Sequence, residues 1–242
     1  MPDAFLSTHA LRAARPEMAL LTIGSVEQHG AHLPLGTDWI IGQALAPRVA
    51  DALGAYCLPV MPFGTAREHS GNLGTTFLEA STLYAVVTDL CTTLAAEGFH
   101  KICVLQTHGG NWVIKPAVRD LNLKRPGLAV AWADPFRLAL PALKEACPTC
   151  INEVHGGEME TSVMLHIAPH LVDMSKAVDF VPEGATQEYL DYLPVTRLCP
   201  PGIWGRATLA TPAKGKVCFE ALVEASVRYF AETHRRLAAL RS

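Results

Sequence analysis

The chain has 242 residues, of which half are apolar and 18% are charged, and its formal net charge is −3. A chain of this length can bury a large core, and we expect one α/β domain over residues 1–242. The small negative charge, without a cluster of Lys and Arg, argues against nucleic acid as a partner. Apolar runs all fall short of the roughly 20 residues that span a bilayer, which argues against a membrane protein.

The cysteines and the N-terminal sequence indicate the cellular compartment in which the protein is expected. The seven cysteines are an odd number in mostly apolar surroundings, and Cys147 and Cys150 form a lone CxxC that we interpret as a loop with two thiols. The N-terminus lacks the pattern of a secretory signal. Reduced thiols in a cytoplasmic protein fit these features, and the high apolar content predicts a homo-oligomer with part of its surface covered.

The first half of the chain alternates short apolar segments with helical patterns. Strands are predicted where apolar runs end at polar or glycine-rich loops, at residues 18–23, 56–60, 101–106 and 128–132. Apolar residues recur with a helical period between them, over residues 39–53, 82–97 and 112–123. This alternation predicts a mostly parallel sheet with helices on both faces, whose ligands bind beyond the carboxyl ends of the strands.

The second half is less regular. Residues 135–154 are interpreted as an irregular segment, whereas residues 158–167 have the spacing of a helix that follows a Gly-Gly turn. Residues 181–215 are rich in Pro and Gly and predict a long excursion that could cover a site. A final helix is expected over residues 217–240.

Side chains that bind metals gather directly after the first predicted strand. Glu27 and His29 are two residues apart and point the same way if the backbone is extended. Asp38, at the start of a helix, could bridge two ions with its two carboxylate oxygens. Taken alone, such a loop is equally consistent with helix capping and solvated charge.

Two further segments carry the same ligand types. His108 follows the clearest strand and precedes two glycines, which let the backbone approach an ion or a substrate. The segment that begins at His155 adds Glu158 and Glu160 ahead of a helix. A lone histidine is more often structural, but the coincidence of three such segments predicts a metal site.

The ligand types indicate the chemistry. Carboxylates and imidazoles without thiolates suit Zn²⁺, Mn²⁺ or Fe²⁺, and a bridging carboxylate suits a pair of divalent ions in each subunit. Such a pair lowers the pKa of a bound water and polarises a carbonyl, so that a hydroxide can attack an amide carbon. His155 is the candidate that passes the proton to the leaving nitrogen. We therefore expect a metal-dependent hydrolase of a small-molecule amide.

Three strings of the sequence resemble signature segments of the creatininase (creatinine amidohydrolase) superfamily, namely GSVEQHGAHLPLGTD, THGGN and HGGEMETSVML. Residues 69–78 and 201–215 resemble two further segments, so that the resemblance covers most of the chain. It implies a three-layer α/β/α fold, two divalent metals and a homohexamer. By motif match it also implies that the metal ligands include Glu27, His29, bridging Asp38 and His108, and that His155 moves the proton.

Two positions depart from creatininase itself. Creatininase has a metal-binding glutamate two residues after the histidine that matches His108, where this chain has Gly110. We expect Glu158 to supply the missing carboxylate, with Glu160 as the alternative or as a catalytic-site acid that orients a ligand. Creatininase also has a tryptophan that packs on creatinine where this chain has Ile151, which argues against creatinine as the substrate.

The resemblance leaves the substrate open. Other members deformylate a formamidopyrimidine nucleotide or trim the precursor peptide of a ribosomally made redox cofactor. A peptidase of this kind would need a broad groove lined by residues 181–215. A third hypothesis, a metal-binding scaffold without catalysis, requires His155 or the pair Glu158 and Glu160 to lie apart from the metal.

Overall fold

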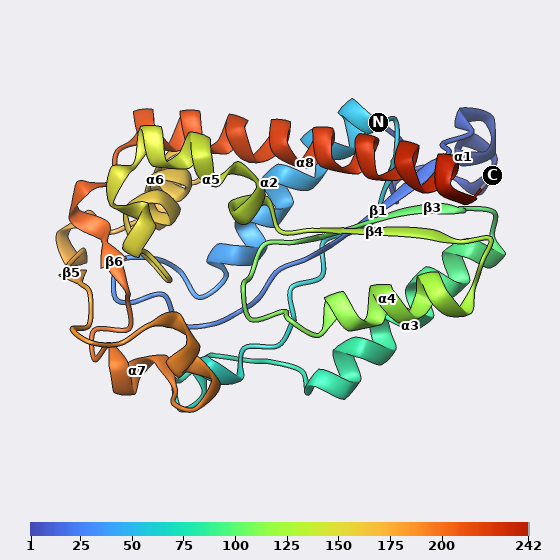
Figure 1. The fold of residues 1–242 in the computed structure, drawn as a ribbon. Coiled ribbons are helices and arrows are strands. Elements are labelled where there is room, and N and C mark those ends of the chain that lie inside the picture. The colour runs from blue at the N-terminus through green and yellow to red at the C-terminus, as the bar shows by residue number, and fades with distance from the viewer. Residues whose placement is uncertain (242) are drawn as a thin grey trace.

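The centre of the molecule is a parallel sheet. The computed structural model describes residues 1–241 and contains a four-stranded sheet in the order β2-β1-β3-β4, with every neighbouring pair parallel (Figure 1). The strands are β1 (Met18–Ile23), β2 (Tyr56–Cys57), β3 (Lys101–Gln106) and β4 (Ala129–Ala133). The predicted α/β fold around a parallel sheet is therefore confirmed.

Helices cover both faces of this sheet (Figure 1). One layer is formed by α2 (Thr37–Leu53), α5 (Pro135–Ala146), α6 (Glu158–Ile167) and α8 (Pro212–Arg241). The opposite layer is formed by α3 (Ala80–Ala96) and α4 (Ile114–Lys124). Two shorter helices, α1 (Thr8–Ala14) and α7 (Val195–Leu198), complete the set.

The strands are mostly apolar because each of their faces packs on helices. In β1, Leu20 belongs to the core shared with α2 and α8, whereas Leu21 and Ile23 belong to the core shared with α3 and α4. The same alternation holds in β3, where Cys103 and Val104 face opposite layers. Burial of each large apolar side chain contributes roughly 1.5–3 kcal/mol, so that these alternating residues hold the three layers together.

Several predicted boundaries differ from the structure. The helix predicted from residue 39 begins at Thr37 after the N-cap Gly36, so that Asp38 lies in its first turn rather than capping it. The prediction of an irregular segment over residues 135–154 is wrong, because α5 occupies its first part. The Asp134 side chain accepts a hydrogen bond from the backbone N–H of Arg137, and Pro135 stands at the first helical position, which suits proline.

The predicted excursion consists of 3₁₀ turns, α7 and one strand of a small antiparallel pair, β5 (Asp179–Phe180) with β6 (Gly205–Arg206). Helix α8 begins at Pro212, five residues before the predicted start at residue 217. The excursion is joined to the body of the molecule by an antiparallel bridge between Trp204 and His155. It therefore lies against one of the predicted site residues.

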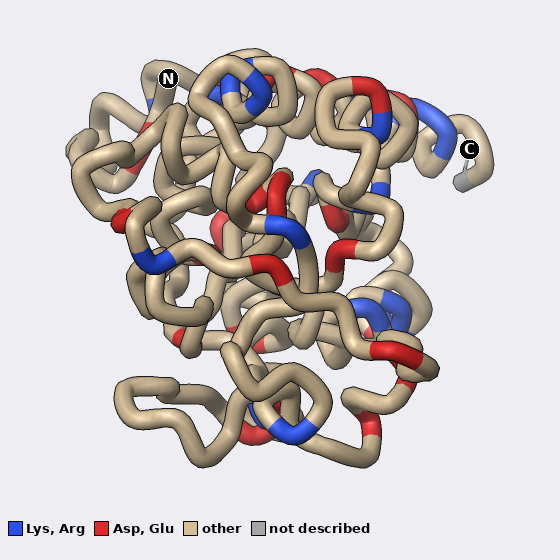
Figure 2. Tube along the Cα trace, turned by 90° about the vertical axis from the view of Figure 1, so that its left-hand side faces the viewer, with Lys and Arg blue, Asp and Glu red and all other residues tan. Residues whose placement is uncertain are grey.

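Charge and hydropathy agree with the composition. Lys and Arg are scattered among Asp and Glu in the view of Figure 2, and no large region of one sign forms there. Within residues 1–241, helices that combine the length and the hydropathy needed to cross a membrane are absent. All seven cysteines are buried free thiols.

Candidate metal centre

Loops after two neighbouring strands bring the predicted ligands together. Strands β1 and β3 are paired in parallel register up to their last residues, so that the loops that follow leave the same edge of the sheet. Glu27 and His29 come from the first loop, His108 from the second, and Asp38 from the first turn of α2. All four residues are buried, with at most 6% of their surface exposed.

Two sets of candidate ligands share Asp38, and a third cluster combines Glu27 and His29 with His155. Glu27, Asp38 and His108 make the first set, and His29, Asp38 and Glu160 the second, with the ligand atoms of each set within 4.8 Å of one another. His108 Nε2 lies 3.1 Å from Glu27 Oε2, and His108 Nδ1 lies 3.4 Å from Asp38 Oδ2. His29 Nε2 lies 3.7 Å from Asp38 Oδ2 and 3.8 Å from Glu160 Oε1.

The ligand atoms converge without hydrogen-bonding one another. Among the described residues, hydrogen-bond partners are lacking for four of these buried atoms: Glu27 Oε1, His29 Nε2, Asp38 Oδ2 and His108 Nε2. A buried polar atom without a partner costs about 1–3 kcal/mol, and native proteins rarely leave several in one place. Carboxylate oxygens and imidazole nitrogens that point into one small volume are a donor set for divalent cations. The residues present therefore fit a centre of two ions.

Hydrogen bonds from behind fix the orientation of these ligands. His29 Nδ1 donates to the backbone carbonyl of Glu27 at 3.0 Å, which leaves Nε2 with a lone pair directed into the site. The hydroxyl of Ser25 donates to Glu27 Oε2 at 2.6 Å. Such partners hold metal ligands in one orientation before an ion binds.

The electrostatics of the site favour a cation. Burial raises the pKa of Glu27 to about 7, although His108 opposes this shift. Burial also tends to raise the pKa of Asp38, but His29 and His108 outweigh it and hold that pKa below its usual value. The carboxylates thus depend on positive charge beside them, and bound divalent ions supply such charge.

Helix α6 places Glu160, and not Glu158, beside the other candidate ligands. The buried Glu158 carboxylate accepts a hydrogen bond of 2.5 Å from Lys214 Nζ and another from the Thr149 hydroxyl, and it belongs to neither set. Two positions along a helix turn a side chain by about 200°, so that Glu158 and Glu160 point in nearly opposite directions. Lys214 is 56 residues from Glu158 in the sequence, and Thr149 belongs to no recognisable motif. Neither contact of Glu158 could therefore be predicted from the sequence. The last ligand of our proposal below is therefore Glu160.

His155 lies against both sets. Its Nε2 donates to the backbone carbonyl of Gln28 at 2.6 Å, so that Nδ1 carries the lone pair and lies 3.7 Å from Glu27 Oε1. The centres of the His155 and His29 rings are 4.2 Å apart. Burial and the neighbouring His29 lower the pKa of His155 to about 4, which keeps the imidazole neutral at pH 7. His155 can therefore accept a proton at Nδ1.

Two residues near the ligands were not among the predicted site residues. His69 Nε2 lies 3.1 Å from Glu27 Oε1, and the Gln28 side-chain nitrogen lies 3.0 Å from His69 Nδ1. Glu68 Oε1 lies 3.2 Å from His108 Nε2. The sequence offered one signal for this loop, because His69 opens the segment of residues 69–78 that resembles the creatininase superfamily.

Glu153 is a further residue that sequence reasoning missed. Its carboxyl oxygens accept hydrogen bonds from the backbone N–H groups of Met159 and Glu160, at 2.9 and 3.1 Å. Burial raises the pKa of Glu153 to about 8, although these two hydrogen bonds oppose the shift. Glu153 thereby holds the first turn of α6, and with it the Glu160 backbone, in place.

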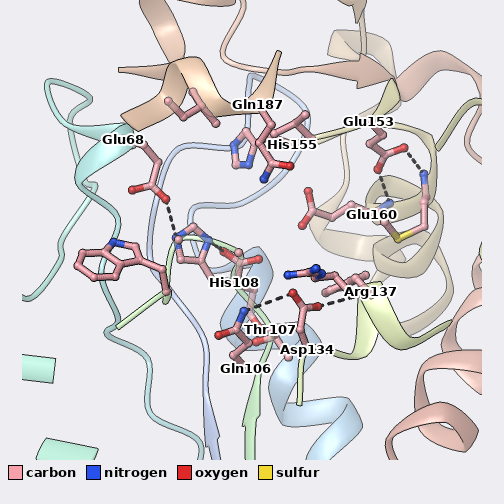
Figure 3. Close-up of a pocket in the computed structure, with 18 of the residues that line it drawn as sticks. Glu68, Gln106, Thr107, His108, Asp134, Arg137, Glu153, His155, Glu160 and Gln187 are labelled. Carbon is pink, nitrogen blue, oxygen red and sulfur yellow. Dashed lines mark hydrogen bonds and ion pairs between the residues drawn. The ribbon is translucent and has the colours of Figure 1, made fainter. Parts of the chain in front are cut away.

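The site opens into a cavity of about 690 Å³, with His108, His155 and Glu160 in its wall (Figure 3). The excursion contributes further lining residues, namely Gln187, Glu188, Leu190 and Val195. The excursion predicted over residues 181–215 thus contributes part of the wall of this cavity. Ile151, which takes the place of the creatinine-packing tryptophan, also lines this cavity.

Comparison with known proteins agrees with this geometry. The family described as creatinine amidohydrolase (creatininase) matches residues 4–230. The chain belongs to the creatininase family. The creatinine amidohydrolase of Pseudomonas putida is 30% identical over 232 residues, which cover 88% of each chain. The mycofactocin precursor peptide peptidase of Mycobacterium ulcerans (strain Agy99) is 29% identical over 221 residues, which cover 85% of this chain and 81% of the relative.

Solved structures of the family confirm the fold. A crystal structure of creatininase has a TM-score of 0.82 and 25% identity and covers 95% of this chain and 96% of that one. Other creatininase structures are described as a Zn-Zn type and as an Mn form. The predicted membership and three-layer fold are thus confirmed, and the chain is a metal-dependent hydrolase of the creatininase family.

Proposed function

We propose that this chain is a two-metal hydrolase that cleaves the carbon–nitrogen bond of a small amide, cyclic amide or formamide. The observation that carries this proposal is the position of Asp38 between the two ligand sets. Glu27 and His108 complete one set, and His29 and Glu160 complete the other. A carboxylate common to two sets is the arrangement expected of a bridged pair of ions.

The residues around the ligands support hydrolysis. When bound, a pair of Zn²⁺, Mn²⁺ or Fe²⁺ ions lowers the pKa of water and polarises a carbonyl oxygen. His155, held by the Gln28 carbonyl, directs Nδ1 toward the site and is the group that carries a proton to the leaving nitrogen. The scaffold hypothesis required the shuttle histidine or both acidic residues to lie apart, but His155 and Glu160 lie among the ligands.

The cavity supports a small substrate. Its volume of about 690 Å³ lies within the range of small-molecule sites, roughly 300–1,000 Å³. Its wall combines aromatic rings with hydrogen-bonding groups: the Trp132 indole N–H donates to Gln106 Oε1 at 3.1 Å, and the Arg137 guanidinium points toward the same space (Figure 3). Such a wall suits a compact molecule with polar groups at several edges.

A peptidase is the second candidate. The mycofactocin precursor peptide peptidase of M. ulcerans has almost the same identity to this chain as the creatinine amidohydrolase, 29% against 30%. The excursion forms one side of the cavity, as a peptide groove would require. In that case the same ligands act on a peptide bond, and exposed Arg137 is placed to pair with a terminal carboxylate.

The test combines metal analysis with a substrate panel. Ions per chain are measured by elemental analysis for the wild type and Asp38→Ala, and hydrolysis of formamides, cyclic amides and peptides is assayed with and without a chelator. We expect about two ions per chain in the wild type, loss of both in Asp38→Ala, and chelator-sensitive hydrolysis of a small amide. Cleavage of peptides alone would favour the second candidate. Metal content that Asp38→Ala leaves unchanged would refute the centre.

We also propose that the chain assembles into a homohexamer. The resemblance to the family implies this assembly, and large side chains with mostly exposed surfaces, such as Leu123 and Tyr192, offer apolar area for contacts. Light scattering coupled to size-exclusion chromatography measures the mass directly, and a monomeric mass would contradict the proposal.

A further inference from the structure

We propose that Glu68 is a ligand of the ion held by Glu27, Asp38 and His108, an inference that rests on the two-metal centre proposed above. Glu68 Oε1 lies 3.2 Å from His108 Nε2, and Glu27 Oε2 lies 3.1 Å from the same nitrogen. Within the described chain this nitrogen makes no hydrogen bond, although two carboxylates are so near. Figure 3 shows the Glu68 carboxylate directed at the His108 ring. Both carboxylate oxygens thus lie beside a candidate ligand nitrogen, and an oxygen so near to that nitrogen is within reach of an ion bound next to it.

Gly110 provides the space for this carboxylate. A Cβ atom added at Gly110 would overlap both Glu68 Oε1 and the His108 ring. The backbone of Gly110 is outside the left-handed region, so that its conformation does not demand glycine. The missing side chain therefore serves the close approach of Glu68 to His108. The His108 loop has no carboxylate at position 110. Glu68, from another loop, thus places its carboxylate in the space that Gly110 leaves free.

The loop that carries Glu68 is fastened to the His108 loop. Glu68 stands in a 3₁₀ turn, Arg67–His69. The backbone N–H of Thr65 donates to Asn111 Oδ1 at 2.9 Å, and the Thr65 hydroxyl donates to the Gly110 carbonyl at 2.5 Å. On the other side of Glu68, His69 contacts Glu27 as described above. Ligands must be held in place before an ion binds, and Glu68 is anchored on both sides.

An ordinary ion pair at the cavity mouth is the competing interpretation. The Glu68 side chain keeps only 17% of its surface exposed, so that its charge is largely removed from water. An ion pair at that depth normally gains from a well-directed hydrogen bond, which His108 Nε2 does not make here. The metal-ligand interpretation explains both the proximity and the missing hydrogen bond.

The test measures metal affinity and coordination rather than activity. The wild type, Glu68→Gln, Glu68→Asp, Asp38→Ala and the control Glu188→Gln are titrated with Co²⁺. Binding is followed by calorimetry and by visible absorption, which reports the donor set of the ion. Glu188 is an exposed carboxylate that lines the same cavity. Circular dichroism verifies that each variant is folded.

We expect both Glu68 variants to weaken one of two Co²⁺ ions at least about tenfold and to change its absorption spectrum, with the second ion unaffected. Glu188→Gln should bind as the wild type does. Glu68→Asp keeps the charge but shortens the side chain, so that weakening in Glu68→Gln alone would reveal a charge effect and overturn the proposal. Unchanged affinities in both Glu68 variants would also overturn it. If the wild type binds no Co²⁺, or Asp38→Ala binds it normally, the two-metal centre itself fails.

Discussion

The backbone carbonyl of Gln28 accepts a hydrogen bond of 2.6 Å from Nε2 of His155. Gln28 stands between two ligands, Glu27 and His29, so that the backbone that carries the ligands also selects the tautomer of the histidine. Because Nε2 holds the hydrogen, the lone pair of His155 is at Nδ1, on the side of the ring that faces Glu27. The proposed proton carrier and two of the proposed metal ligands are thereby oriented by the same short loop.

Replacement of His155 tests this role. His155→Ala should lower kcat by about 10²–10⁴-fold on any substrate found in the panel, because the proton carrier is lost, while about two ions per chain remain bound. Kinetics and elemental analysis of the same preparation give both numbers. Loss of one ion would show that His155 is a ligand, as its proximity to Glu27 and His29 also permits.

The two glutamates of α6 should behave differently. Glu160→Gln removes a ligand of the second set and should weaken one ion by at least about tenfold, because an amide oxygen is a poorer donor than a carboxylate. Glu158→Gln, two residues away, should leave both ions in place, since its side chain is turned toward Lys214. Competition with a chromophoric chelator measures both affinities. Weakened metal binding in Glu158→Gln with normal binding in Glu160→Gln would reverse the assignment.

Glu158 should instead matter for stability. Lys214→Met leaves the buried Glu158 carboxylate without its ion-pair partner, and we expect the free energy of unfolding to fall by roughly 2 kcal/mol, less than for a fully buried pair because Lys214 is partly exposed. Lys176→Met breaks an exposed pair with Asp173 and should cost less than about 1 kcal/mol. Urea unfolding of both variants provides the comparison, and equal losses would contradict a structural role for the Glu158 pair.

The raised pKa of Glu153 predicts a pH dependence of stability. The folded protein keeps the Glu153 proton up to about pH 8, whereas the unfolded chain loses it near the ordinary value of 4.5. Between these values the folded state binds more protons, so that this group's contribution to stability falls as pH rises, by up to about 1.4 kcal/mol per pH unit. Relative to Glu153→Gln, the wild type should lose stability from pH 5 to 8 in urea titrations. A constant difference between the two would show that Glu153 is ionised in the folded state.

The fold and much of the site could be predicted from local sequence. Strands β1 and β3 were predicted with their observed bounds because each is a short apolar run that ends at a polar loop. Glu27, His29 and His108 follow these strands directly, and parallel pairing places them at one edge. Their proximity therefore follows from the register of neighbouring strands.

Contacts between distant segments could not be predicted in this way. The choice between Glu158 and Glu160 depends on which face of α6 meets Asp38 and which meets Lys214, and the packing of α6 against α8 decides this. Glu68 reaches His108 through a loop contact whose geometry no local period encodes. Helix α5 was missed although Asp134 and Pro135 provide a start signal and its apolar residues follow a helical period; it contains an internal proline, Pro141, a residue that normally argues against a helix.

The residues of the two ligand sets come from different parts of the sequence. Glu27, Asp38 and His108 all lie in the first half of the sequence, beside paired strands β1 and β3. Glu160 lies on α6, which packs against α8, and the Ser162 hydroxyl accepts a hydrogen bond from the backbone N–H of Thr211, just before α8 begins. The residues of the first set all precede the C-terminal helix in the sequence, whereas the second set depends on a helix that packs directly against it. The two halves of the proposed centre therefore differ in how far they depend on the C-terminal part of the chain.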